Sequence, residues 1–361
     1  VGNNTEAMIG SNATLDSGAD LTVSAINNKK LDAIAASGAV SFANSVAGSI
    51  GVTVDSSTAR AHVDSGAKIN QDSITRALAS QHNVTVKAVN NADIDVTTGA
   101  VSASIGSGIG GTLNVVTTSQ VPEALINVGP TGSVSSEGLI NVDADSISTS
   151  NAQSAVGAGG LTAGIAGGAV TLFDDSMTSA SIGNGSVIDD ADEVKVDADS
   201  TRTATADTKG AAVGAVGVGG SVATVEMEGV TTASVAANAK LGTNGAIGSL
   251  DVDATATETA TAKAVALAAG IIAGTGSVAT TSVKTTVSAS TGSNTEIVAD
   301  GAIGISAQAT PEVSAESIGV SVAGGLKIGA STAKTELTQT VKAALGASNV
   351  VNANKLRIIA T

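Results

Sequence analysis

The sequence predicts an all-β fold, a repetitive parallel β-helix (β-solenoid) with units of about 53–63 residues. Three observations predict it: one strand motif recurs along the chain, apolar and polar residues alternate around it, and large side chains are scarce. The chain has 361 residues with 43 Gly, two Phe and no Tyr, Trp or Cys, yet 42% of its residues are hydrophobic. A conventional core buries large aromatic and Leu side chains, so Ala and small β-branched residues require a thin, regular core.

The recurring motif is a pentapeptide whose first, third and fifth residues are apolar and whose second and fourth residues are mostly polar. This alternation is the signature of a strand with one buried face. The seven copies span residues 21–25, 84–88, 140–144, 194–198, 250–254, 303–307 and 356–360, with spacings of 63, 56, 54, 56, 53 and 53 residues. We expect each copy to be a strand.

A second alternating motif precedes these pentapeptides, as in residues 5–10, 178–183 and 231–235. Short apolar stretches follow it, and Gly, Asn and Asp separate the stretches. Segments such as Gly183–Gly185 and Gly242–Gly245 tolerate positive φ and are predicted to turn the chain.

The third part of each unit is a long uncharged run, as in residues 41–54, 101–116, 155–173 and 264–283. In the first run, Phe42, Val46 and Ile50 share one parity, and small neutral residues occupy the other parity. The apolar parity is expected to be buried, with Phe42 and Phe173 pointing inward. The small face contains Ala43, Ser45, Ala47 and Ser49.

Two of these runs reach the ~20 residues that a membrane-spanning helix needs. Their period of two and their Gly, Ser and Thr content argue against such a helix, and the equivalent segment after Ala211 carries Glu226 and Glu228. We therefore expect no membrane insertion by this segment. Whether each unit forms three narrow coils or fewer, wider coils stays open. With three coils, Asp143, Asp197 and Asp253 of successive pentapeptides would lie about 14 Å apart at ~4.8 Å per coil.

Composition limits the possible partners. The formal charge of −15, from 17 Lys and Arg against 32 Asp and Glu, argues against nucleic acid. A mean hydropathy of +0.31 and only three Pro argue against disorder. The absence of Cys excludes disulfides and suits an exported bacterial protein. Because residue 1 is Val and no signal peptide follows, we expect a single continuous array over residues 1–361, cut from a longer chain.

The combined pattern is a Gly- and Ala-rich run, then Thr-x-Ala-x-Ile-Gly as in residues 178–183, then an apolar pair, then Val-x-Val-x-Ala as in residues 194–198. It resembles the repeat regions of giant secreted bacterial exoproteins, the leukotoxin-like and filamentous-haemagglutinin-like autotransporter or two-partner-secreted adhesins. The resemblance covers the whole chain and concerns its repeat pattern. It implies a parallel β-helix displayed on the bacterial cell surface or outside the cell, and it transfers no functional residues.

Few residues stand out as candidate ligands. The acidic cluster Asp189, Asp190, Asp192 and Glu193 could supply oxygen ligands for Ca²⁺, but a solvated turn between two strands is the favoured interpretation. The chain lacks the Gly-Gly-x-Gly-x-Asp nonapeptides of calcium-binding β-rolls. We expect no other cofactor. Triplets suited to Asn glycosylation begin at Asn3, Asn12, Asn83 and Asn184, a composition effect in a chain rich in Ser and Thr.

A β-helical carbohydrate enzyme is the catalytic alternative, and it would need paired carboxylates on one face. Asp174 and Asp175 are adjacent, so a strand would direct them to opposite faces. His62 and His82 lie in the longest unit, around an insertion at residues 71–81. Without Tyr or Trp, the chain also lacks the aromatic platform on which sugars stack. We expect that the chain is not an enzyme.

The main hypothesis is a structural or adhesive stalk in which neighbouring repeats of the same polypeptide form one continuous core. Its partner would be a host or neighbouring-cell surface. The alternative is a self-assembling extracellular filament or sheath component, associating laterally through Ala43, Ser45, Ala47 and Ser49.

Overall fold

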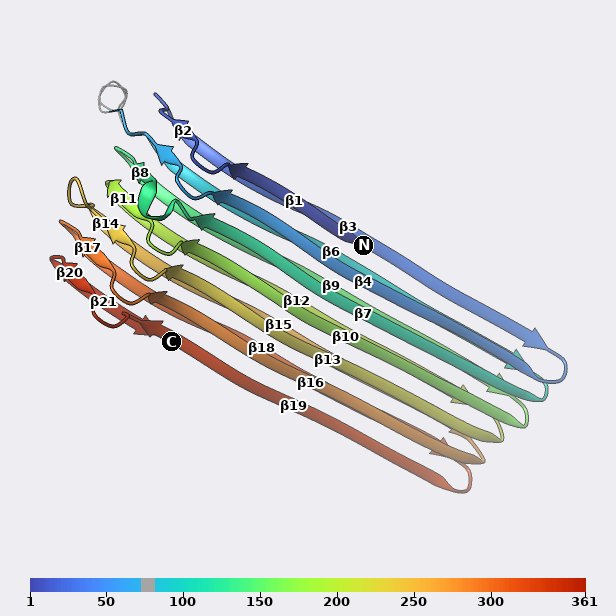
Figure 1. Ribbon diagram of the computed structural model, residues 1–361. Coiled ribbons are helices and arrows are strands. Elements are labelled where there is room, and N and C mark those ends of the chain that lie inside the picture. The colour runs from blue at the N-terminus through green and yellow to red at the C-terminus, as the bar shows by residue number, and fades with distance from the viewer. Residues whose placement is uncertain (73–81) are drawn as a thin grey trace.

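The computed structural model describes residues 1–72 and 82–361. Its strands form three parallel sheets of seven strands each, and every repeat adds one strand to each sheet (Figure 1). We name the sheets A, B and C. The predicted parallel β-solenoid is confirmed.

Sheet A holds the strands that lead from the long uncharged runs into the second alternating motif. They are β1 (Gly2–Ile9), β4 (Ser45–Val63), β7 (Ser107–Ile126), β10 (Ala163–Ile182), β13 (Val216–Val235), β16 (Ile272–Thr291) and β19 (Lys327–Ala344).

Sheet B holds short strands at one end of the molecule. They are β2 (Thr14–Leu15), β5 (Lys68–Ile69), β8 (Ser133–Ser135), β11 (Val187–Asp190), β14 (Lys240–Leu241), β17 (Glu296–Val298) and β20 (Val350–Asn352). A 3₁₀ turn, η1 (Gly129–Thr131), precedes β8. Within the described residues, no helix has the length and apolar character needed to cross a membrane.

Sheet C begins with the recurring pentapeptides. Its strands are β3 (Leu21–Ser41), β6 (Val84–Ser104), β9 (Leu139–Gly160), β12 (Glu193–Val213), β15 (Ser249–Gly270), β18 (Ala302–Ala323) and β21 (Lys355–Ala360). The pentapeptides pair in register along the whole sheet, so that Val86 lies between Val23 and Val142. The predicted anchor strands are therefore confirmed.

Each unit forms one wide coil, which decides the question that the sequence left open. A long sheet C strand runs out to a tight turn, and a long sheet A strand runs back beside it to the short sheet B strand (Figure 1). We call the end with sheet B proximal and the end with the tight turns distal. The distal turns occupy residues 42–44, 105–106, 161–162, 214–215, 271 and 324–326.

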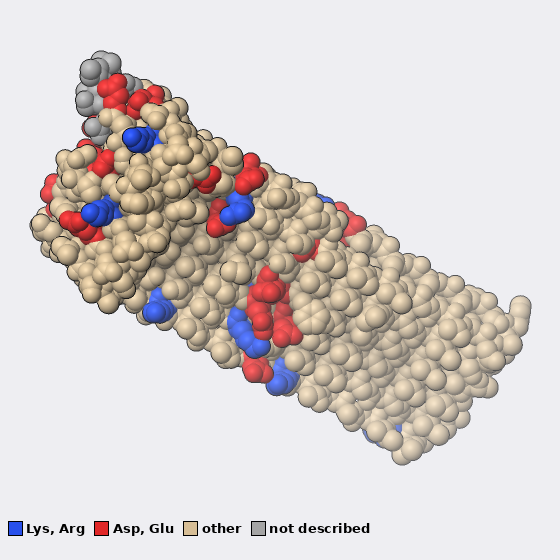
Figure 2. All heavy atoms as spheres, viewed as in Figure 1, with Lys and Arg blue, Asp and Glu red and all other residues tan. Residues whose placement is uncertain are grey.

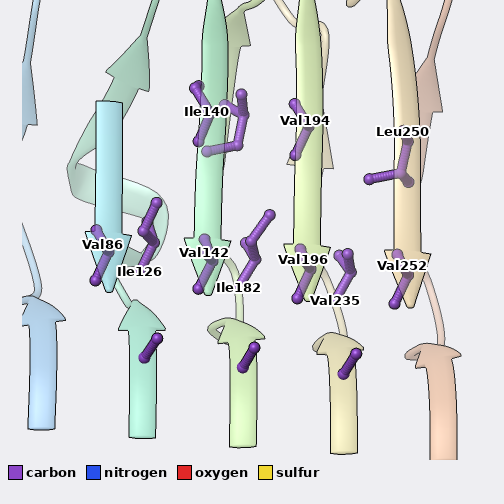
Figure 3. Close-up of a cluster of buried hydrophobic side chains, with 14 of the residues drawn as sticks. Val86, Ile126, Ile140, Val142, Ile182, Val194, Val196, Val235, Leu250 and Val252 are labelled. Carbon is purple, nitrogen blue, oxygen red and sulfur yellow. The ribbon is translucent and has the colours of Figure 1, made fainter. Parts of the chain in front are cut away.

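The proximal core is apolar and lies where the three sheets meet (Figure 3). Each sheet contributes a column of stacked side chains, one from each coil. Examples are Ile126, Ile182 and Val235 from sheet A, Val134, Ile188 and Leu241 from sheet B, and Val142, Val196 and Val252 from sheet C. At the proximal corners Gly185 and Gly242 have φ of 68° and 81°, as the turn chemistry predicts.

The distal interior is made of small residues, because sheets A and C approach each other closely there. A Cβ on Gly110 would lie 2.9 Å from the carbonyl oxygen of Gly157 on the facing strand. Larger apolar side chains therefore point outward. The expectation that the two Phe residues are buried is wrong, since Phe42 is 90% exposed and Phe173 is 39% exposed.

Candidate functional site

An acidic ladder crosses the outer face of sheet C. Asp197 of β12 pairs directly with Asp143 of β9 and Asp253 of β15. Neighbouring strands lie about 4.8 Å apart, so the separation of about 14 Å that three coils per unit would give does not apply. Because each unit makes one wide coil, residues that are more than 50 positions apart in the sequence lie on adjacent strands.

Two lysines compensate the ladder in part. Lys87 Nζ lies 2.5 Å from Asp143 Oδ2 and 2.7 Å from Asp145 Oδ2, and Lys195 Nζ lies 2.5 Å from Asp197 Oδ2. These ion pairs leave the centre of the ladder with more carboxylates than cations. The carboxylates of the ladder therefore repel one another, and protonation or added salt weakens this repulsion.

Asp199 experiences this repulsion most strongly. Partial burial, followed by the charges of Asp197 and Asp145, raises the pKa of Asp199 to about 6. Burial likewise raises the pKa of Asp143 and of Asp253. The ladder can exchange protons near neutral pH. Among the residues that the structure describes, however, no group of three or more His, Cys, Asp or Glu is placed to hold a metal ion.

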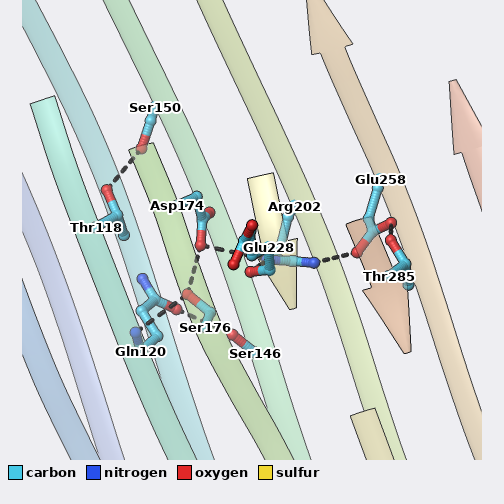
Figure 4. A network of polar contacts seen from close by, with 10 residues as sticks. All are labelled: Thr118, Gln120, Ser146, Ser150, Asp174, Ser176, Arg202, Glu228, Glu258 and Thr285. Atoms are coloured by element: carbon cyan, nitrogen blue, oxygen red, sulfur yellow. Dashed lines mark hydrogen bonds and ion pairs between the residues drawn. The ribbon is translucent and has the colours of Figure 1, made fainter. Parts of the chain in front are cut away.

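A second charged group is buried between the sheets and centres on Arg202 of β12 (Figure 4). Its Nη1 lies 3.4 Å from Asp174 Oδ1 and donates to the Glu228 carbonyl oxygen at 2.8 Å. Its Nη2 pairs with Glu258 Oε1, and Thr285 donates to the other Glu258 oxygen. The three charged side chains are 1% exposed.

This network is closed to solvent and acts as a structural cross-link. It joins β10, β12 and β15, which belong to both large sheets and to three successive coils. Burial raises the pKa of Asp174, and the positive charge of Arg202 opposes that shift. Gly229 leaves room for the guanidinium, because a Cβ at this position would clash with the Arg202 Nη2 atom.

Sequence reasoning missed this network, although the strand parity carries a signal for it. Arg202 has the same parity as the buried residues Val194 and Val196 of its own strand. A charged residue at a buried parity position needs an opposite charge nearby. Which strands supply that charge depends on the coil geometry, so Asp174 and Glu258 could not be assigned as partners.

The proposed calcium ligands do not gather into one site. Asp189 is buried and accepts a hydrogen bond from Thr243 Oγ1 at 2.5 Å, while Glu193 begins β12. No metal-holding group exists here within the described ranges. Asp189 and Asp190 belong to β11, and only residues 191–192 connect it to β12, so the interpretation as a solvated turn holds for part of the cluster.

The residues proposed for self-association do not form a surface. Ser45, Ala47 and Ser49 are 5%, 6% and 9% exposed and point between the sheets. Ser45 Oγ lies 2.7 Å from Ser102 Oγ of the facing strand, and Ala43 is exposed in the distal turn. The parity was recognised correctly, but its direction was wrong, because close sheet packing admits only small side chains inside.

The catalytic candidates are separated as predicted or engaged elsewhere. Asp174 is buried and Asp175 is exposed, so they face opposite sides of β10. His62 Nε2 lies 2.9 Å from Glu6 Oε1 and its Nδ1 lies 2.7 Å from Asp64 Oδ1. Partial burial lowers the pKa of His62, but these hydrogen bonds outweigh it and raise the pKa above 6.5.

The second histidine, His82, is buried, and most of the insertion at residues 71–81 lies outside the described residues.

Comparison of the chain with models of protein families, with curated proteins and with solved structures found no match.

Proposed function

We propose that this chain is a structural, non-catalytic segment of a large bacterial protein that is secreted or displayed on the cell surface. It serves as a stalk that carries adhesive parts encoded elsewhere in that protein, so the contact with a host or neighbouring cell lies mainly outside the segment. The repeat pattern and its resemblance to secreted adhesins support this proposal, as does a composition without Cys.

The observation that carries the proposal is the equivalence of the coils. Leu21, Val84 and Ile140 stack in one register column, and the same column continues through the remaining pentapeptides. Each coil packs its apolar side chains against those of the next coil. A solenoid can therefore be lengthened by adding coils, without any localised active site. The largest buried charges, around Arg202, are closed off from any substrate.

The coil width decides what kind of stalk this is. Seven strands at about 4.8 Å give roughly 34 Å along the stacking direction, whereas a strand of 21 residues at about 3.3 Å extends for roughly 70 Å. The segment is therefore shaped like a board. It is wider along its strands than it is long in the stacking direction, which is the direction in which it would lengthen a stalk. Such a board resists bending and presents a large lateral surface.

Removal of one complete coil tests the proposal. Deleting residues 139–192 joins Gly138 to Glu193, which is the register partner of Leu139. In a bacterial display system that exports an epitope-tagged segment, the shortened chain should reach the surface, remain folded by circular dichroism and resist protease. A localised catalytic or receptor site would make one coil indispensable. Loss of export and folding on deletion of this coil, or a hydrolytic activity abolished by it, would contradict a stalk.

Small-angle X-ray scattering on the isolated segment tests the board shape separately. A board of these dimensions and ordinary protein density has a radius of gyration of roughly 24 Å, between the ~21 Å of a globule of this length and the ~28 Å of a narrow rod. A value at either extreme would contradict the wide coil.

A further inference from the structure

The distal half of sheet A carries an uncharged apolar surface on its outer side. No Lys, Arg, Asp or Glu occurs in residues 45–54, 107–117, 163–173, 216–225, 272–283 or 328–333. Charged side chains gather at the proximal part of the visible face, and its distal half is almost entirely uncharged (Figure 2). We call the outer side of these residues the distal A face.

In this half of the molecule large apolar side chains lie outside, while the interior holds small residues, both Ala and hydroxyl-bearing side chains. Outside, Ile109, Leu113 and Val218 are 41%, 40% and 44% exposed. Inside, hydroxyls bond to one another or to the facing backbone, as in the 2.6 Å bond from Ser221 Oγ to the Val265 carbonyl oxygen. Water alone would favour the opposite arrangement, so the exposed apolar residues indicate a partner that covers them.

The apolar residues form two ridges that cross the strands. In each ridge the residues are register neighbours on adjacent coils. Ridge 1 consists of Val46, Ile109, Ile165, Val218 and Ile328, with Gly274 in the remaining coil. Ridge 2 consists of Ile50, Leu113, Val222 and Val278, with Ala169 and Thr332 in the remaining two coils. The ridges repeat at the strand spacing of about 4.8 Å.

A groove separates the two ridges, because the outward residue between them is small in every coil. The row consists of Gly48, Gly111, Gly167, Gly220, Gly276 and Ala330. None of these glycines has a positive φ, and a Cβ on them would meet nothing closer than 3.6 Å. The fold itself does not require them, and Gly in a strand interior often marks a place where another molecule approaches.

We propose that the distal A face is a self-association surface that binds the same face of a second copy of this chain. The face spans six strands, or roughly 29 Å, by about ten residues, or roughly 33 Å, which gives roughly 950 Å². A standard stable interface buries about 800 Å² per partner. A partner whose side chains match every ridge position must repeat at about 4.8 Å, which is the period of another stacked coil.

The ridges and the groove fit each other when the second copy is related by a two-fold axis along the stacking direction. Ridge 2 of one copy then lies in the glycine groove of the other copy, and the reverse contact forms by symmetry. This arrangement also places the two proximal ends at opposite ends of the dimer. It thereby separates the charged parts of two chains that each carry a formal charge of −15.

The distal A face is better suited to this contact than the other exposed apolar surfaces. On the outer side of sheet C, Lys209 lies among the apolar residues Val101, Val213 and Leu267, and Asp207 lies two residues away. A lipid bilayer is a poor occupant, because fluid acyl chains have no fixed period that matches the ridges, whereas a second copy repeats at the same strand spacing of about 4.8 Å.

Sedimentation velocity and light scattering over a concentration series test the proposal. The full chain should change from 34.3 kDa to about twice that mass as its concentration rises. The double variant Leu113→Lys with Val222→Lys places charges on ridge 2 and should shift the dissociation constant upward at least 100-fold. Gly167→Leu fills the groove where a Cβ has open space and should weaken association at least tenfold.

Two matched controls locate the surface. Ser119→Lys with Thr232→Lys adds the same charges to the outward side of the same strands, β7 and β13, in the proximal half. Val101→Lys with Leu267→Lys adds them to the distal face of sheet C. Both controls should dimerise as the wild type does. Far-UV circular dichroism and the urea midpoint should show that every variant is folded.

Three results would overturn the proposal. The chain could stay monomeric at millimolar concentration, or its dimer could survive the ridge 2 charges and be lost with the sheet C charges. It could also remain monomeric and float with phosphatidylcholine vesicles, which would identify lipid as the occupant. A monomeric segment could still serve as a stalk, so these results are distinguishable from failure of the coil-deletion test.

Discussion

The Arg202 network provides the sharpest test of how this fold tolerates charge inside a thin core. Substitution of Arg202 by Met keeps most of the side-chain volume but removes the positive charge between Asp174 and Glu258. Both carboxylates are 1% exposed and would be left without an ion-pair partner. Breaking a buried ion pair from one side costs about 3–5 kcal/mol, so we expect a loss of about 4 kcal/mol at pH 7.

The loss should depend on pH with a defined sign. Burial raises the pKa of Asp174 and the charge of Arg202 opposes that shift, so without Arg202 this pKa rises further above its unfolded value and the folded variant binds more protons than the unfolded chain. Stability of the variant should therefore increase as the pH falls from 7 toward 4, and the gap to the wild type should narrow. Combining Arg202→Met with Asp174→Asn and Glu258→Gln should recover most of the loss at pH 7.

Urea unfolding followed by far-UV circular dichroism measures these differences, because the chain has no Trp or Tyr for fluorescence. Arg60→Met is the matched control. Arg60 pairs with Glu123 at 2.7 Å, but the two side chains are 45% and 31% exposed, so its loss should cost at most about 1 kcal/mol. If Arg202→Met were no more destabilising than Arg60→Met, or if its loss were the same at every pH, the reasoning would fail.

Three further predictions concern the acidic ladder and the close sheet contact. Because the pKa of Asp199 is raised to about 6, its ionisation should lower the stability of the fold by about 1 kcal/mol, after solvent screening, as the pH rises from 4 to 6. The substitution Asp199→Asn should remove this dependence and flatten that part of the plot of urea midpoint against pH. Lys87→Met should destabilise the protein at low salt by about 1–2 kcal/mol, and 0.5 M NaCl should reduce that loss; an unchanged loss would argue against charge repulsion in the ladder. Gly110→Ala should destabilise the protein by about 1–3 kcal/mol, because its Cβ would lie 2.9 Å from the Gly157 carbonyl oxygen. The substitution Gly111→Ala, at the adjacent position that faces outward, should be neutral or stabilise the protein by about 0.5 kcal/mol in the same urea assay. Equal effects of the two substitutions would contradict the close sheet contact.

Much of the stacking could be read from the sequence. The pentapeptides that begin at Leu21 and Val84 alternate with period two, and their recurrence requires that the same strand be built repeatedly. The structure pairs these pentapeptides in register without a shift. Turn residues such as Gly185 were recognisable as well, because a left-handed backbone restricts the choice of residue locally.

The direction of each face was not determined locally. Val46 and Ala47 alternate in the sequence, and that alternation defines two faces without saying which one is inside. Apolar residues were expected inside because that rule holds for an isolated sheet in water. The rule fails in the distal half, where a second sheet is so close that Ala47 fits and Val46 does not.

The sequence by itself thus determined the strands, their parity, their turns and the repeat that stacks them, because these depend on the backbone and on nearest neighbours along the chain. Only the tertiary structure decided that each repeat makes one wide coil. That geometry places Asp143 beside Asp197, gives Arg202 its two carboxylates and turns Leu113 outward. These contacts depend on how far a strand runs before it turns and how closely the facing sheet packs, and the alternation of residues within one strand encodes neither.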